Sequence, residues 1–418
     1  MRTASLLPVV IAVGGALTVS ANVEAQFRKA DYENPVSVLA AEVVPRPLFR
    51  SPHYQVDDDV GIRENTYQFR VESELGAFTT SSLSLLRIRL NEIATLAQAV
   101  SAFNRNNRKL GAEIRGALRV RKDNFADILT SPLTTAASLA GQLTQNVGET
   151  VGFAKRKPHA DKGGNTRPVP VDAVAAAHRR TVASQLGLDV YSTNPSVQQF
   201  FDAVVKAREA GRVGTSLTLV RKPTVATVHV AGGQLDAQVA TVIRQLSADE
   251  VNAVVRDELL RMKVALPATR AFMNNTVLSP LHRLSIVAHL DFLGAMPNRG
   301  AIVGLAARAR GEAEGLAYVE LARMFASYHE RVQRIVAIEK LGAFPMARTA
   351  RELVLFVPAD IVHWDERSDR LTNAFAERAL KQTKATARLV VLGNVTERAR
   401  TSFNRGGVDV FEQFLTPR

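Results

Sequence analysis

Three short apolar stretches near the C-terminus decide the fold, namely LVLFV at residues 353–357, LVVL at 389–392 and VDVF at 408–411. Helical patterns over residues 369–382 and 395–404 separate them. Unbroken apolar strands that alternate with helices are typical of a parallel sheet covered on both faces. We therefore predict a small parallel βαβαβ module over residues 346–418.

The rest of the chain indicates an α+β protein that is predominantly helical. Alternation of apolar and polar residues from Tyr67 to Leu75, followed by Gly76, predicts an antiparallel strand pair. Apolar residues at helical spacing dominate from residue 171 to residue 345, with the longest helix from about Ala301 to Gly342. We predict four parts after the first 25 residues: an N-terminal arm, strand pair and helices over 26–154, a Gly- and Pro-rich flexible linker over 155–170, a helical domain over 171–345, and the C-terminal module.

The first 25 residues predict export. Arg2 precedes an uncharged apolar run over residues 6–17, and small residues end at Ala25. This is the layout of a secretory signal peptide, and the run is too short to span a bilayer as a helix. The chain contains no cysteine. A secreted protein of the bacterial cell envelope, in the periplasm or outside the cell, fits these features.

Composition excludes a disordered chain and points to acidic partners. The chain has 418 residues, 46% of them hydrophobic and 22% charged, and a formal net charge of +13. A basic exported protein is attracted to an anionic membrane surface or an acidic polymer. Nucleic acid is disfavoured, because the basic stretch 105–122 contains no aromatic residue on which bases could stack.

A weakly amphipathic segment over residues 131–154 follows this basic stretch. It has two interpretations: a helix of the protein core, or a helix that lies on a membrane surface. For the second interpretation we expect binding through the basic residues Arg115, Arg119 and Arg121 and the apolar residues Leu143 and Val147. The sequence leaves both interpretations open.

A polar cluster follows the first C-terminal strand and supplies the weak catalytic candidates, Asp360, His363, Asp365 and Asn394. In open parallel sheets, ligands bind beyond the carboxyl ends of strands. The alternative is that Asp365 caps the next helix and the other polar residues are solvated. No nucleophile elbow or phosphate loop is present, and no cofactor is predicted.

A metal site is not predicted either. His282 and His289 are the most closely spaced histidines on one predicted helix, and they are seven residues apart. Two ligands of one zinc ion on a helix are usually three or four apart.

Two functions remain after these exclusions. The sequence favours a non-catalytic binding protein of the cell envelope, whose partner is an anionic surface or another protein. The alternative is a secreted, hydrolase-like enzyme with its site after the first C-terminal strand.

Overall fold

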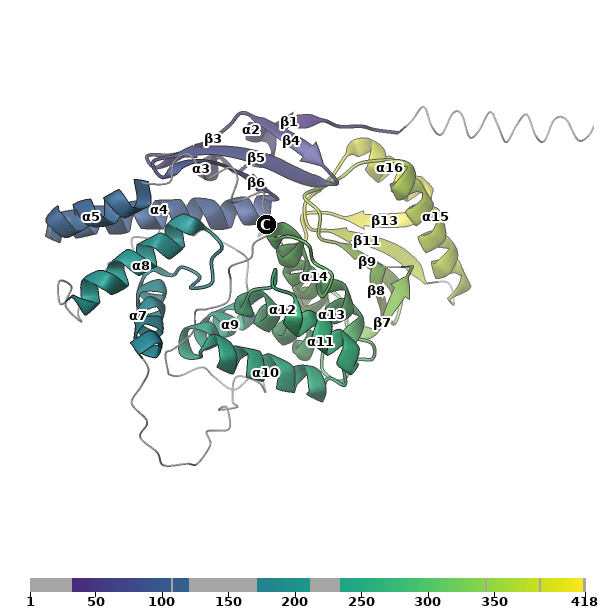
Figure 1. Cartoon of the computed structure of the whole chain (residues 1–418). Helices are drawn as coiled ribbons and strands as arrows, with labels where there is room; N and C mark the ends of the chain where they lie inside the picture. The colour runs from purple at the N-terminus through teal and green to yellow at the C-terminus, as the bar shows by residue number, and fades with distance from the viewer. Residues whose placement is uncertain are drawn as a thin grey trace, which may run out of the picture.

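The computed structural model describes residues 32–106, 108–119, 171–210, 234–342, 344–382 and 385–415. Over these ranges the chain is α+β and predominantly helical, which confirms the predicted class. An N-terminal sheet lies above a long helix, a group of helices lies beneath it, and a second sheet lies at the C-terminal end (Figure 1). The expected signal peptide (1–25), amphipathic segment (131–154) and linker (155–170) lie outside the described residues.

The N-terminal sheet is antiparallel and larger than the predicted strand pair. Its central strand alternates buried and exposed residues, and Tyr67, Phe69 and Val71 form the buried face. The strands over residues 59–63 and 54–56 pair with the first and the last part of one edge of this central strand. The strand over residues 76–81 pairs with its other edge. The elements are β1 (Ser37–Leu39), α2 (Ala40–Val43), α3 (Arg46–Phe49), β2 (Arg50–Ser51), β3 (Tyr54–Val56), β4 (Asp59–Arg63), β5 (Thr66–Ser73) and β6 (Gly76–Ser81).

Helix α4 (Leu83–Asn106) connects two hydrophobic cores. Its first half packs Leu86 and Leu90 against the N-terminal sheet. Its second half packs against the helices below, where the rings of Phe103 and Phe200 lie 6.1 Å apart. The helix therefore holds the sheet and the helical group in a fixed relation.

The helical group follows local signals in the sequence. Ser247 and Glu250 form the predicted capping box at the start of α10, and Ser279 caps α12. The elements are α5 (Arg108–Arg119), α7 (Val171–Leu186), α8 (Pro195–Glu209), α9 (Gln234–Gln245), α10 (Ala248–Arg261), α11 (Leu266–Asn274), α12 (Pro280–Phe292), α13 (Gly300–Ala306) and α14 (Glu312–Arg331).

The predicted long helix from Ala301 to Gly342 is wrong. The chain breaks between α13 and α14, where Gly311 is the N-cap in an extended conformation. It then turns into strand β7 (Ile335–Leu341), whose β-branched residues favour extended backbone. Helical spacing of apolar residues continues through this region and does not reveal the change.

The C-terminal sheet has five strands in the order β13-β11-β9-β8-β7. The three apolar stretches lie in β9, β11 and β13, which run parallel, whereas β7 and β8 extend one edge antiparallel. Since β7 begins before residue 346, the sheet starts earlier than the predicted module. The elements are β8 (Phe344–Thr349), β9 (Glu352–Val357), β10 (Ile361–Val362), α15 (Glu366–Lys381), β11 (Thr386–Val391), β12 (Asn394–Val395), α16 (Glu397–Arg405) and β13 (Val408–Phe411).

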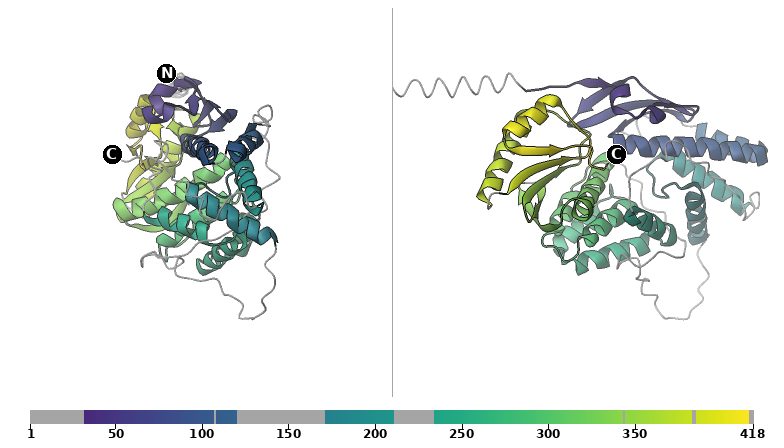
Figure 2. Two further views of the ribbon diagram at one scale, coloured as in Figure 1. Left: turned by 90° about the vertical axis from the view of Figure 1, so that its left-hand side faces the viewer. Right: turned by 180° about the vertical axis from the view of Figure 1, so that it is seen from behind.

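This sheet is the middle of three layers. Helices α15 and α16 cover its outer face, and α14 covers the face toward the helical group (Figure 2). The inner contact is aromatic: the ring of Phe325 on α14 lies 4.3 Å from that of Phe356 on β9.

Asp360 joins the C-terminal sheet to the N-terminal part. Its Oδ2 accepts a hydrogen bond from the backbone N–H of Tyr67 and its Oδ1 accepts one from that of Leu83, each at 3.0 Å. Leu83 is the first residue of α4, so Asp360 satisfies a helix N–H from another part of the chain. Its own N–H donates to the carbonyl of Asn65 in the β4–β5 turn, at 3.2 Å.

Burial raises the pKa of Asp360 to about 6, although the two backbone hydrogen bonds and the charge of Arg87 partly oppose this. The side chain is only 7% exposed. The neighbouring position 393 requires glycine, because a Cβ on Gly393 would lie 2.0 Å from the carbonyl oxygen of Asp360. The turns that follow β9 and β11 therefore touch through their backbones.

We predict that Asp360→Ala lowers the free energy of unfolding by about 1–3 kcal/mol for each buried N–H left without an acceptor. Urea denaturation measures this loss, with Asp409→Ala, an exposed change in the same sheet, as the control. The folded pKa of Asp360 lies above the ordinary value of 3.8. This carboxyl therefore makes the native state lose stability as the pH rises from about 4 to about 7, and the variant should lack that contribution. Equal losses in the two variants would contradict the assignment.

Candidate functional site

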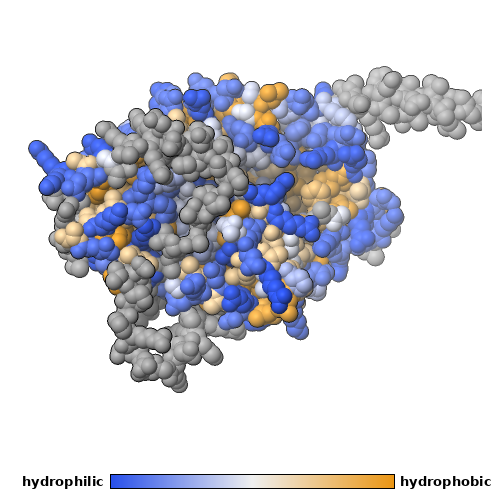
Figure 3. All heavy atoms as spheres, in the orientation of Figure 1, coloured by the Kyte–Doolittle hydropathy of each residue, from blue (hydrophilic) through white to orange (hydrophobic). Residues whose placement is uncertain are grey.

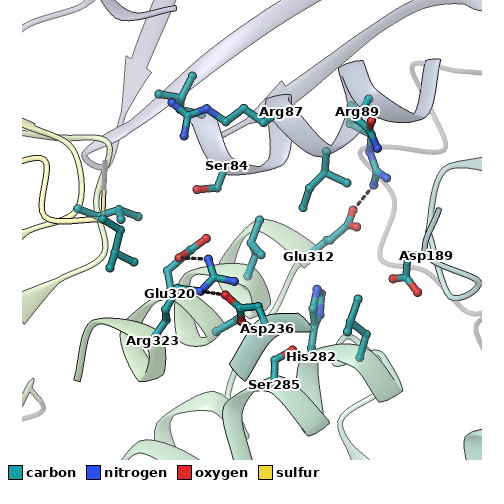
Figure 4. A pocket seen from close by; sticks show the side chains of 18 of the residues that line it. Ser84, Arg87, Arg89, Asp189, Asp236, His282, Ser285, Glu312, Glu320 and Arg323 are labelled. Carbon is teal, nitrogen blue, oxygen red and sulfur yellow. Dashed lines mark hydrogen bonds and ion pairs between the residues drawn. The ribbon is translucent and has the colours of Figure 1, made fainter. Parts of the chain in front are cut away.

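A cavity of about 680 Å³ lies where the three parts of the protein meet. Helix α4 forms one wall, and α9, α12 and α14 form the wall opposite (Figure 4). The loop over residues 187–194 and the turns after β9 and β11 also line the cavity. Its lining combines charged groups with apolar side chains such as Ile88, Val239 and Leu316.

One side of the cavity is built on Arg89, a guanidinium that is only 2% exposed. It pairs with Glu92 of the same helix at 2.9 Å and with Glu312 at the start of α14. It also donates to the hydroxyl oxygens of Ser192 and Thr193 in the 187–194 loop, at 3.3 and 2.6 Å. Burial opposes the charge on Arg89, but the two carboxylates outweigh burial and raise its pKa.

A second network lies on the wall opposite α4. Asp236 of α9 faces Nε2 of His289 at 3.3 Å and Nε of Arg323 at 3.1 Å. Arg323 also pairs with Glu320 at 2.8 Å. Burial opposes ionisation of Asp236, but the hydrogen bond from His289 and the charge of Arg323 lower its pKa. These groups are therefore mutually satisfied.

Burial shifts the pKa of both Asp189 and His282, which favours the uncharged form of each side chain. Burial raises the pKa of Asp189 to about 7, and the negative charges of Glu92 and Glu312 add to this. Burial lowers the pKa of His282, so its imidazole is neutral at pH 7. Within the described residues Asp189 has no ion-pair partner, and the one hydrogen bond of its carboxyl group is from the N–H of Tyr191 at 2.9 Å.

Arg87 is the cation of this cavity without a partner among the described residues. It lies on α4, half-buried, and makes no hydrogen bond or ion pair within the described ranges. Burial lowers its pKa, whereas the charges of Glu320 and Asp360 act in the opposite direction. A guanidinium has five N–H donors and is always charged at neutral pH. Those donors are available to a bound molecule.

The described lining is acidic, in contrast to the chain as a whole. Seven carboxylate residues and four arginines line the cavity, whereas the complete chain carries +13. The paired groups largely cancel one another. Of the remaining charged lining residues, Glu42 and Arg244 are exposed, and Asp360 accepts from two backbone N–H groups. Asp189 and Arg87 are therefore the partly buried groups of the described lining that can act on a ligand.

The structure divides the sequence-predicted catalytic residues into two groups. Asp360 and Asn394 border the cavity, and they lie next to each other because β10 pairs with β12. His363 and Asp365 do not line it. Asp365 caps α15 by accepting a hydrogen bond from the N–H of Ser368 at 2.7 Å. Nε2 of His363 lies 3.8 Å from Oδ2 of Asp365.

Most of the residues predicted to bind an anionic surface lie outside the residues that the structure describes. Arg115 is exposed on α5, and Arg119 is the last residue of that helix. Arg121, Leu143 and Val147 lie outside the described residues.

Across the described ranges, no three His, Asp or Glu side chains gather as they would around a metal ion. Nor is any described helix long and apolar enough to cross a membrane.

Sequence reasoning missed Arg89, Asp189 and Glu312. Arg89 and Glu92 are spaced i, i+3 on a helix, which is an ordinary surface pattern. The one available signal was that Arg89 directly precedes Leu90 and follows Leu86 within the predicted apolar stripe. Its other partners are 103 to 223 residues away in sequence, where no local pattern could associate them.

No protein-family model, curated protein or solved structure matches this chain.

We predict that Arg89→Met destabilises the protein by about 3–5 kcal/mol, because Glu92 and Glu312 then keep buried charges without a counter-ion. Urea denaturation measures the loss. Arg256→Met, on the exposed face of α10, is the control and should stay within about 0.5 kcal/mol of the parent. Adding Glu92→Met and Glu312→Met should restore part of the loss. If the single variant were as stable as the control, the network would not hold the cavity wall.

Proposed function

We propose that this protein is an exported binding protein that holds a small organic molecule in its central cavity. The observation that supports this most is the cavity itself, which has a volume of about 680 Å³ and walls from all three parts of the chain. Ligand pockets usually measure about 300–1,000 Å³ and combine apolar walls with a few placed polar groups. The lining matches this description.

The arrangement of charges supports binding more than catalysis. Most of the charged lining residues are held in the networks around Arg89 and Asp236, which fix the shape of the walls. The catalytic group predicted from sequence is not assembled, since His363 and Asp365 lie away from the cavity. Asp360 is occupied with two backbone N–H groups.

We predict that filling the cavity abolishes binding. Ser84 lies on α4 and faces the cavity (Figure 4), so Ser84→Trp places an indole inside it. The full chain is incubated with a small-molecule extract of the cells that produce it, and native mass spectrometry then detects retained ligand. The parent should retain a compound of a few hundred daltons, as pockets of this size do, and Ser84→Trp should not.

The control is Ala374→Trp on the exposed face of α15, which should bind as the parent does. Retention of the same compound by all three proteins would place its site elsewhere and contradict the proposal.

A second proposal is that the basic end of the molecule associates with an anionic surface. Helix α5 buries Ile114 and Leu118 and exposes Arg108, Lys109 and Arg115. Hydrophilic side chains project from that end of the molecule (Figure 3). Each basic residue near an anionic membrane contributes on the order of 1 kcal/mol. The exposed basic face of α5 supports this proposal.

We predict that changing Arg115, Arg119 and Arg121 together to Glu weakens sedimentation with liposomes that contain anionic lipid. Raised salt should have the same effect, because the attraction is screened. In the matched control, three arginines that are exposed on α10, α11 and α15 are changed to Glu, namely Arg256, Arg270 and Arg367. An equal loss in both triple variants would show that net charge, rather than α5, governs the association.

A further inference from the structure

We infer that the ligand of the cavity carries a carboxylate and an ammonium group, as an amino acid or a short peptide does, with Arg87 binding the carboxylate and Asp189 the ammonium. This inference rests on the proposed function. It adds the chemical class of the molecule and the residues that select it.

The carboxylate end follows from Arg87. A half-buried guanidinium with no hydrogen bond to the described residues is costly unless a ligand or water satisfies its donors. Its planar fork matches a carboxylate and can bind it through two parallel hydrogen bonds. Two other arginines of the lining, Arg89 and Arg323, are already held by carboxylates of the protein. The fourth, Arg244, is exposed and donates to the hydroxyl oxygen of Thr241.

The ammonium end follows from Asp189. One of its oxygens accepts from Tyr191, and none of the described cations pairs with either oxygen. The carboxylates of Glu92 and Glu312 lie near enough to oppose its ionisation, and the charge of Arg89 partly offsets them. An ammonium group next to Asp189 would pair with its free carboxylate oxygen. The site therefore favours a cation next to Asp189.

The lining of the cavity also includes apolar side chains. Arg87 reaches the cavity from α4 and Asp189 from the 187–194 loop, on different walls (Figure 4). Ile88, Val239 and Leu316 line the region as well. A molecule that carries two opposite charges and apolar side chains fits this lining. Leucine and the peptides of two or three leucines are such molecules.

Isothermal titration calorimetry on the full chain tests the inference with leucine, dileucine and trileucine. At least one of these should bind. Acetylation of its amine or amidation of its carboxylate should each weaken binding about tenfold or more, since each removes a charge-assisted contact. Blocked peptides that bind as tightly as the free peptide would overturn the inference.

Two variants assign the ends of the ligand. The Arg87→Met variant should bind the free and the amidated peptide with equal affinity. The Asp189→Asn variant should bind the free and the acetylated peptide with equal affinity. The matched controls Arg256→Met and Asp257→Asn, both exposed on α10, should preserve the differences. If each variant instead weakened all peptides alike, the two residues would not select the charged ends.

The pH dependence gives an independent readout. An ammonium group binds the ionised form of Asp189, whose pKa of about 7 means that the carboxyl is protonated below neutral pH. Affinity for the free peptide should therefore fall from about pH 7.5 to about pH 5.5. The acetylated peptide should not show this fall, and neither should the Asp189→Asn variant with the free peptide. A pH-independent affinity would count against Asp189 as the ammonium site.

Failure of this inference differs from failure of the proposed function. If no peptide binds but a small molecule is still lost on Ser84→Trp, the ligand class is wrong and binding in the cavity stands. If no peptide binds and no compound is retained, both are wrong.

Discussion

A charge that cannot reach water constrains much of this structure. Because the Arg89 guanidinium is buried, it must be neutralised by groups that come to it. Those groups belong to α4, the 187–194 loop and α14, so satisfying one side chain fixes the positions of three segments. Burial is the main cause of the raised pKa of Asp189, and the two carboxylates around Arg89 add to it. The network that fixes the cavity wall therefore also contributes to the electrostatics of the cavity.

The chain as a whole and the lining of its cavity have opposite net charge. The complete chain carries +13, whereas carboxylates outnumber arginines in the described lining of the cavity. At physiological ionic strength the field of exposed charges decays within about 8 Å, while groups in a partly enclosed cavity are screened less. The exterior and the cavity can therefore attract molecules of opposite charge without interfering with each other.

Local patterns in the sequence predicted local structure. The capping box of Ser247 and Glu250 and the apolar segments of β9 and β11 depend on neighbouring residues only, and the structure contains both. The change from helix to strand at Ile335 was missed because the pairing partner, β8, decides it. Asp360 and Asn394 could be placed near the cavity because residues after adjacent parallel strands meet at one edge. The Arg89 network could not, because its partners come from distant segments.

The contacts of Asp360 also bear on how quickly the chain can fold. They join residues 293 and 277 positions apart, so the N-terminal hairpin and the first turn of α4 are synthesised long before their acceptor. Contacts between such distant residues cost loop-closure entropy before they add stability, and chains rich in them fold slowly. Until the last strands arrive, the N-terminal sheet lacks part of its support and its unpaired edges are open to other chains. Assembly of the cavity is thus a late event, and protection from aggregation matters most during that interval.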